Sequence, residues 1–252
     1  MKSSLNKSQI ERFSRQLVLK NIGVRGQKKI FCSKILVVGI GGLGCPAAES
    51  LVRAGIGTIG LVDDDIVNLS NIHRQSLFNS KDVKKSKVSV AAKKLREISP
   101  LTKIKTYKSR LNKKNIENII KNYEIIIDGS DNFKTKFLIN DYCIKFKKKL
   151  ITGAISKFDG HIFTFDFNDK KTASLKSFYQ EKDISDNILN CEFEGVLGTI
   201  ASIVGTIQAN EALKMIVEIG QNLKNQILII DLLNLNFRKV KYKKNNIQSI
   251  NE

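Results

Sequence analysis

The stretch "KILVVGIGGLGCPAAESL", residues 34–51, decides the fold class of this chain. An apolar strand at 34–39 runs into a glycine-rich turn, and the turn opens an apolar helix at 43–55. The turn glycines are Gly39, Gly41, Gly42 and Gly44. Such glycines let a phosphate approach the backbone, and the N-terminus of the following helix attracts its negative charge. The stretch therefore predicts a nucleotide-binding βαβ unit.

Strands and helices continue to alternate as far as residue 146. The apolar patterns predict strands at 58–63, 103–107 and 124–128, and helices at 86–99, 112–122 and 132–146. Nearly continuous apolar strands such as "EIIID" suit a sheet that is covered on both faces. This order is typical of a Rossmann-like, doubly wound α/β sheet with parallel strands.

The second half of the chain has a different pattern. Strands at 149–155 and 161–167 are separated by "SKFDG", which indicates an antiparallel hairpin. A polar stretch predicts a long crossover loop at about 168–194, followed by a helix at about 196–218 and strands at 225–232 and 236–243. We expect one domain over 1–252, with N-terminal helices at 1–30, a nucleotide-binding core at 34–146 and an antiparallel half at 147–252.

Composition places the chain among soluble globular proteins. Of its 252 residues, 42% are hydrophobic and 27% are charged. The start "MKSSLNKSQIERFSRQ" lacks the apolar segment of a secretion signal, and "GVLGTIASIVGTIQA" is shorter than the roughly 20 apolar residues that span a bilayer. The four cysteines have neither metal-like nor disulfide-like spacing. We expect a cytoplasmic protein with no membrane partner.

The net charge of +19 raises the question of a polyanionic partner. The excess is mostly lysine, dispersed among Asn and Ile, without interleaved aromatic residues or a nucleic-acid-binding motif. We therefore predict no nucleic-acid partner. The basic surface suggests the hypothesis of faster capture of an acidic protein, in which case association should slow as salt is added.

The acid after the glycines fits either of two nucleotides. Asp63 follows them by about 20 residues, where a carboxylate binds a ribose hydroxyl of NAD or of ATP. The loop "LVDDDIVNLSNIHRQSLF" and the following "KKSKV" supply further candidate ligands: Asp65, Ser70, Asn71, Arg74, Gln75 and Lys87. A departing pyrophosphate needs cations, which favours ATP. Lys87 considered alone is better interpreted as a solvated surface charge.

A dehydrogenase would need a proton donor in its substrate site. His161 alternates with phenylalanines along a strand and is predicted to be a packing residue, and His73 to be an ordinary loop residue. An NAD-dependent dehydrogenase therefore leaves the cationic residues unexplained, although the glycines alone permit it.

The strand at 124–128 is followed by "GSDN", which brings Asp131 to the carboxyl edge of the sheet. Mg²⁺ binds through one or two carboxylates together with phosphate oxygens, so Asp131 is a candidate Mg²⁺ ligand beside Asn132. The alternative is that Asp131 only caps the following helix.

These motifs resemble, in order, those of the ThiF/MoeB/HesA family, bacterial relatives of ubiquitin-activating enzymes. The matching stretches run from "RFSRQ" at 12–16 through "VGIGGLG", "VDDDIVNLSNIHRQ", "KSKV" and "GSDN" to "GVLGTIASIVGTIQANEALK" and the last strands. The resemblance implies an adenylyltransferase that uses ATP and Mg²⁺. Its substrate would be the C-terminal Gly-Gly carboxylate of a small ubiquitin-like sulfur carrier protein, for thiamin, molybdopterin or another sulfur-transfer pathway.

The resemblance also implies roles for individual residues. Gly42 and its neighbours would hold phosphate and Asp63 the ribose, while Asn71, Arg74 and Lys87 would line the triphosphate and Asp131 would hold Mg²⁺. Arg15 matches an arginine that reaches into the partner subunit's site, which implies a homodimer. Cys191, in "LNCEFEGVLG", matches a cysteine that can link covalently to the carrier; a passive cysteine is the alternative.

The chain departs from the family at the zinc site that many members hold with two CxxC pairs. Here the first pair reads Ser174-Leu175-Lys176-Ser177, and no cysteine follows Cys191. Serine lacks the softness and charge of a thiolate, so we predict no bound zinc. With no fused rhodanese domain, we expect the sulfur donor to be a separate protein. A non-catalytic family member that acts as a binding partner is the third interpretation.

Overall fold

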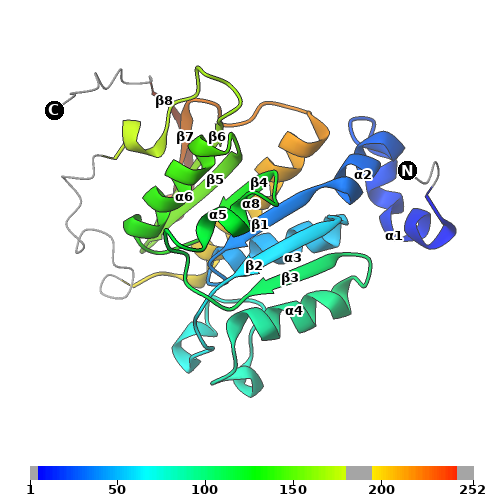
Figure 1. Cartoon of the computed structure of the whole chain (residues 1–252), viewed down its shortest axis with the longest axis horizontal. Coiled ribbons are helices and arrows are strands. Elements are labelled where there is room, and N and C mark those ends of the chain that lie inside the picture. The colour runs from blue at the N-terminus through cyan, green and yellow to red at the C-terminus, as the bar shows by residue number, and fades with distance from the viewer. Residues whose placement is uncertain (1–4, 180–194, 243–252) are drawn as a thin grey trace.

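The computed structural model describes residues 5–179 and 195–242, which contain one eight-stranded sheet (Figure 1). The strand order is β3-β2-β1-β4-β5-β6-β7-β8. The strands are β1 Lys34–Val38, β2 Thr58–Val62, β3 Lys103–Tyr107, β4 Ile125–Asp128, β5 Lys149–Ser156, β6 Asp159–Asp166, β7 Gln226–Asp231 and β8 Asn236–Lys241. Strands β1 to β5 pair in parallel, and β5 to β8 pair antiparallel. The predicted α/β fold with a parallel and an antiparallel half is confirmed.

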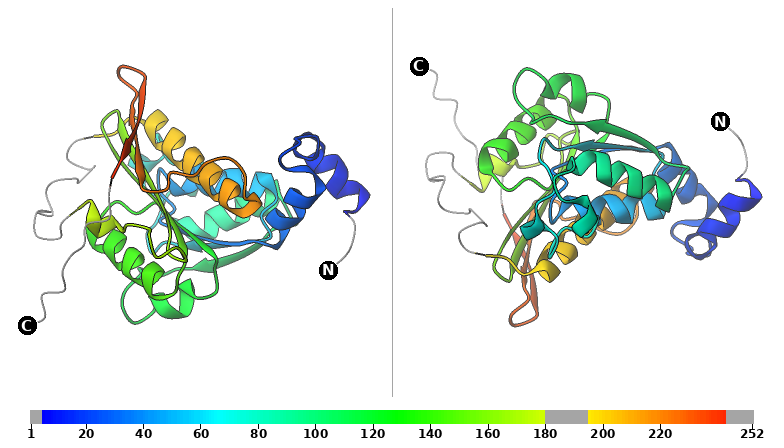
Figure 2. Two further views of the ribbon diagram at one scale, coloured as in Figure 1. Left: turned by 90° about the horizontal axis from the view of Figure 1, so that it is seen from above. Right: turned by 90° about the horizontal axis from the view of Figure 1, so that it is seen from below.

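Helices cover both faces of this sheet. They are α1 Lys7–Leu17, α2 Gly23–Cys32, α3 Gly44–Ala54, α4 Lys87–Ile98, α5 Ile116–Ile120, α6 Phe133–Lys145 and α8 Gly198–Val217. Figure 2 shows α3, α4 and α8 on one side and α5 and α6 on the other. Within residues 5–179 and 195–242, every helix is too short or too polar to serve as a membrane span.

The strand sequences explain this two-sided packing. In β1, Ile35 and Val37 face the α3 side, whereas Leu36 and Val38 face the α6 side. All four residues are buried, because successive side chains of a strand point to opposite faces and both faces are covered. A continuous apolar run is therefore what a central strand of this sheet requires.

Helix α5 is shorter than the predicted helix at 112–122. The Asn112 side chain accepts hydrogen bonds from the amides of Lys114 and Asn115, and the Asn115 side chain accepts one from the amide of Asn112. These side-chain bonds close a turn where the first helical turn was expected. The helix begins only at Ile116.

The β5–β6 hairpin is tighter than the five-residue connection predicted. The ladder continues to the pair Ser156–Asp159, which leaves Lys157 and Phe158 as the turn. Lys157 adopts a left-handed conformation with φ of +52°. Two-residue hairpin turns use such positive φ values because they match the twist of the strands.

Candidate active site

A cavity of about 700 Å³ lies at the carboxyl ends of the parallel strands and continues over β5 and β6. In open α/β sheets this edge is where ligands bind. Most of the residues predicted to hold nucleotide or metal line it: Gly39, Gly41, Gly42, Asp63, Asp65, Asn71, Arg74, Gln75, Lys87, Asp131 and Asn132. Segments that are far apart in the chain thus meet around one space.

The turn glycines serve different needs. Gly39 has a φ of +82°, and a β-carbon there would lie 2.9 Å from the carbonyl oxygen of Gly129. A β-carbon on Gly44 would lie only 1.8 Å from the carbonyl oxygen of Gly39, so this glycine permits the turn to close. Gly44 is not among the residues that line the cavity, and its contact with nucleotide stays a prediction. Gly41 does line it, and a β-carbon there would have only the Gln75 amide nitrogen nearby, at 3.7 Å.

Helix α3 begins at the end of this turn. Leu43 occupies the N-cap position and provides no side-chain hydrogen bond to the first helical amides. Amides at a helix start carry partial positive charge and suit a phosphate oxygen. The turn and the helix start therefore have a backbone that could hold a phosphate, as the sequence predicts for a phosphate cradle.

Asp63 is held firmly at the end of β2. Its carboxylate oxygens accept hydrogen bonds from the amides of Ile40, at 2.7 Å, and Asp65, at 2.8 Å. Burial raises the pKa of Asp63, and these amides together with the charge of Lys87 offset the effect only in part. The carboxylate joins the glycine turn to β2 and faces the cavity with its remaining acceptor capacity.

Lys87 is a buried cation of the cavity wall. Its ammonium lies 2.6 Å from the Asp65 carboxylate, and its side chain is 8% exposed. The interpretation of Lys87 alone as a solvated surface charge is therefore wrong. The two ends of the loop 64–86 lie close together, because the amide of Lys87 donates to the carbonyl oxygen of Asp65. This brings Lys87 back to the cavity. A buried ammonium in a wall of this kind supplies charge where a phosphate could accept it.

Of the four ligands predicted at 70–75, three line the cavity. Arg74 donates to the carbonyl oxygen of Ser70 at 2.9 Å and keeps its side chain on the cavity wall. Gln75 is buried, and its side-chain oxygen has no partner within the described residues, so it has unused hydrogen-bonding capacity. Asn71 is also buried. Ser70 is exposed and is not among the residues that line the cavity, so its role as a ligand stays a prediction.

Asp131 and Asn132 follow β4, and their side chains have different partners. Asn132 is the N-cap of α6, and its side chain accepts from the amide of Thr135 at 2.9 Å. The alternative assignment of Asp131 as the helix cap is therefore wrong. Asp131 is exposed at the cavity, and one of its carboxylate oxygens accepts from the Asn132 amide group at 3.2 Å. The carboxylate is free to bind a ligand in the cavity.

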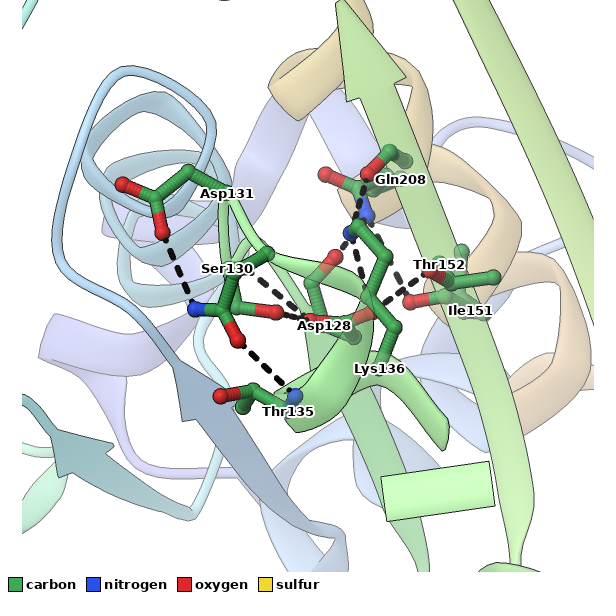
Figure 3. Close-up of polar contacts among 10 residues, drawn as sticks. Asp128, Ser130, Asp131, Thr135, Lys136, Ile151, Thr152 and Gln208 are labelled. Atoms are coloured by element: carbon green, nitrogen blue, oxygen red, sulfur yellow. Dashed lines mark hydrogen bonds and ion pairs between the residues drawn. The ribbon is translucent and has the colours of Figure 1, made fainter. Parts of the chain in front are cut away.

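Sequence reasoning missed the buried charges beneath this loop (Figure 3). Asp128, the last residue of β4, pairs with Lys136 of α6 at 3.1 Å, and both side chains are buried. Thr152 of β5 donates to the same carboxylate at 2.6 Å. A lysine among buried positions of α6 was the available signal, since lysine is almost never buried unless it is paired.

The part of the cavity over β5 and β6 was also missed. Gly153 to Ser156 of β5, and Asp159 to His161 of β6, line it together with Tyr179. His161 is half-buried there, so it is not solely the packing residue that was predicted. Burial lowers the pKa of His161, with a small opposing effect of Asp159. The imidazole is therefore neutral near neutral pH.

Of the two remaining predicted site residues, one lies away from the cavity and the other is outside the described part of the chain. Arg15 is exposed on α1, which lies beside α2 at the end of the sheet where β1 begins, away from the cavity (Figure 1). Cys191 lies outside the described residues. Ser174 precedes a short 3₁₀ turn that ends at Ser177; the Ser174 amide donates to the Ser177 hydroxyl, and the Ser177 amide donates to the Ser174 carbonyl. Across 5–179 and 195–242, no three His, Cys, Asp or Glu side chains converge as a metal site would need.

Comparison with known sequences identifies close relatives. A sequence profile described as "ThiF family" matches residues 13–249. The chain is 39% identical over 246 residues to a "Probable molybdopterin-synthase adenylyltransferase" of Gracilaria tenuistipitata var. liui, covering 97% of this chain and 68% of that protein. It is 35% identical over 242 residues to the "Sulfur carrier protein adenylyltransferase" of Thermus thermophilus, covering 95% of this chain and 89% of that protein. It spans only 53% of the "Adenylyltransferase and sulfurtransferase MOCS3" of Drosophila virilis, at 39% identity and 95% coverage of this chain.

Solved structures share the fold at lower identity. Escherichia coli MccB crystallised with ATP superposes with a TM-score of 0.81 at 20% identity, covering 95% of this chain and 74% of that one. The PaaA crystal structure superposes with a TM-score of 0.80 at 21% identity, covering 97% and 77%. At such identities the likeness concerns the fold alone.

Proposed function

The chain belongs to the ThiF family, and on that premise we propose that it is an ATP-dependent adenylyltransferase of a small ubiquitin-like sulfur carrier protein. One observation carries the proposal: the structure gathers Asp63, the glycine turn, Lys87 and Asp131 around a single cavity. The relatives named as adenylyltransferases, at 35–39% identity, support the same reaction class.

The cavity residues divide the work of holding ATP. The fixed carboxylate of Asp63 would accept hydrogen bonds from the ribose. The glycine turn and the start of α3 would hold phosphate oxygens, and Arg74 and Lys87 would neutralise the charge that develops on the departing pyrophosphate. In an NAD enzyme these two cations would have no comparable task, so the cavity favours ATP over a dinucleotide.

The donor set at Asp131 fits a magnesium ion. Mg²⁺ prefers carboxylate and phosphate oxygens, and Asp131 presents an exposed carboxylate to the cavity beside the phosphate cradle. When bound, Mg²⁺ would neutralise phosphate charge and orient the phosphates. The chain's own part is to hold that carboxylate in place, and the Asn132 side chain does so by donating to it.

The cavity region over β5 and β6 would receive the carrier's C-terminal Gly-Gly tail. Gly153 and Gly160 line that region, and a β-carbon on either would collide with Val204 of α8, so these glycines let the helix pack close behind this wall of the cavity. The terminal carboxylate would attack the α-phosphate, forming an acyl-adenylate and releasing pyrophosphate.

Further proposals concern the assembly. Residues 1–252 would form a single domain, cytoplasmic and homodimeric, with Arg15 reaching the partner subunit's site. The sulfur donor would be a separate protein, and Cys191 would link covalently to the carrier. The absence of zinc is tested by metal analysis of the purified protein, where a stoichiometric zinc signal would refute it.

The decisive experiment is ATP–pyrophosphate exchange with candidate carriers that end in Gly-Gly and with the same carriers lacking that tail. Exchange only with the intact tail would support the proposal, and carrier preference would name the pathway. ATP binding without exchange for any carrier would favour a non-catalytic binding partner instead. Binding of reduced nicotinamide cofactor, followed by fluorescence, would favour a dehydrogenase.

A further inference from the structure

The buried carboxylate of Asp128 organises the chain immediately before Asp131. One of its oxygens accepts hydrogen bonds from the amide of Ser130, at 3.0 Å, and from the Ser130 hydroxyl, at 2.6 Å. The other oxygen accepts from the Thr152 hydroxyl and the Lys136 ammonium. Four donors therefore saturate a carboxylate that is 1% exposed, and two of them belong to the loop that carries Asp131.

Lys136 joins this carboxylate to the next strand. Its ammonium lies 3.1 Å from Asp128 and also donates to the carbonyl oxygen of Gly153 at 2.7 Å (Figure 3). Gly153 belongs to the β5 segment that lines the far part of the cavity, and Lys136 itself lines the cavity. One ammonium thus connects the strand that precedes Asp131 with the strand proposed to receive the carrier tail.

The remaining contacts leave the loop little freedom. Gln208 of α8 donates to the backbone carbonyl of Asp128 at 2.9 Å. The amide of Gly129 donates to Val38 at the end of β1, and the backbone of Gly129 lies against Gly39. The Asp131 loop, residues 129–132, is therefore packed directly on the phosphate cradle. Any displacement of this loop would change the distance between Asp131 and the glycine turn.

We infer that Asp128, Lys136 and Thr152 form a positioning unit that sets Asp131 at the distance from the glycine turn that a metal-bound nucleotide requires. The inference rests on the proposed function. None of the three is assigned contact with the reacting atoms; each acts through Asp131 and its loop. A buried, fully hydrogen-bonded charge pair suits this task because its partners cannot shift without leaving a charge unsatisfied.

A merely structural ion pair would behave differently. Its loss would loosen the fold and weaken every ligand to a similar degree. A positioning unit for Asp131 would weaken metal binding to the nucleotide complex, while the ribose end of the site, held by Asp63 on β2, would keep its affinity. Measuring the affinity for metal and the affinity for AMP therefore distinguishes a structural ion pair from a positioning unit.

The experiment compares Lys136→Met with the wild type and with Lys145→Met. Lys145 is the matched control, because it lies on the same helix in an exposed ion pair with Glu117. Mn²⁺ binding in the presence of ATP is followed by electron paramagnetic resonance, AMP binding by calorimetry, and folding by circular dichroism. We expect Lys136→Met to weaken Mn²⁺ binding by about tenfold or more while AMP affinity stays within about twofold, with a change of tenfold corresponding to about 1.4 kcal/mol. Lys145→Met should match the wild type in both.

Two results would overturn the inference: folded Lys136→Met with wild-type Mn²⁺ affinity, or equal weakening of Mn²⁺ and AMP. If Lys136→Met does not fold, Thr152→Val decides, since it keeps the side-chain shape and removes only one donor to Asp128. Selective weakening of Mn²⁺ in that variant supports the inference, and unchanged binding overturns it. A wild type that binds Mn²⁺ and ATP but exchanges no pyrophosphate would defeat the proposed function and leave this comparison intact.

Discussion

The ammonium of Lys87 lies 2.6 Å from the carboxylate of Asp65, with the lysine side chain buried and the aspartate about half exposed. Asp65 lies on the solvent side of the pair and holds the buried lysine at the cavity wall. Burial alone would raise the pKa of Asp65, but hydrogen bonds from Lys87 and the amide of Ile66 hold it below its ordinary value. The Asp65 carboxylate is thus ionised at neutral pH and holds the Lys87 side chain in place before any nucleotide arrives.

Lys87→Met should lower the rate of ATP–pyrophosphate exchange by about 100-fold or more, because it removes a cation from the place where pyrophosphate charge develops. Asp65→Asn should cost far less, since the ammonium remains. Steady-state exchange rates for both variants against ATP concentration check this. A Lys87→Met enzyme within a few-fold of the wild type would remove Lys87 from the proposed mechanism.

Asp131→Ala should abolish exchange and leave the fold intact. The side chain is exposed, so its loss should change the free energy of unfolding by no more than about 0.5 kcal/mol. Urea denaturation and exchange assays on the same preparation test both parts. Asp141→Ala, at an exposed acid on the following helix α6, serves as the control and should remain active. Activity retained by Asp131→Ala would exclude this carboxylate as the metal ligand.

Gly41→Ala and Gly44→Ala should separate binding from folding. The new methyl group at Gly41 has only the Gln75 amide nearby, at 3.7 Å, and stands in the cavity, so the variant should fold normally and lose ATP affinity. The methyl group at Gly44 would overlap the carbonyl of Gly39, so this variant should unfold at a markedly lower urea concentration. Equal stability of the two variants would contradict the assigned roles.

His161→Gln should flatten the dependence of stability on pH. Burial lowers the pKa of His161 below its ordinary value of 6.5, so on acidification the unfolded chain binds a proton before the folded chain does. The free energy of unfolding of the wild type should then fall between about pH 7 and about pH 5 by more than that of His161→Gln. Urea denaturation at both pH values measures this, and His73, present in both proteins, cancels in the difference. Parallel profiles would show that the histidine is not desolvated.

Much of the site was predictable because its requirements are local. The glycine turn needs residues without a β-carbon, and Asp63 and Asp131 follow strands whose apolar runs mark where each strand ends. Parallel strands end at one edge of a sheet, so residues that follow them meet there. Errors arose where side chains compete locally, as at Asn112 and Asn115, which replace a helical turn, and at Asn132, which takes the cap from Asp131.

The sequence by itself determined the alternation of strands and helices in the nucleotide core, the glycine turn and the family, because hydrophobic periodicity and backbone constraints are written into short stretches. Only the tertiary structure decided that Lys87 is buried beside Asp65, that Lys136 pairs with Asp128, and that His161 faces the cavity. These are contacts between residues on different elements, or burial set by the packing of whole elements. In the sequence, a lysine on the surface cannot be told from a lysine buried in the cavity wall. Its function depends on the residues that surround it in the fold.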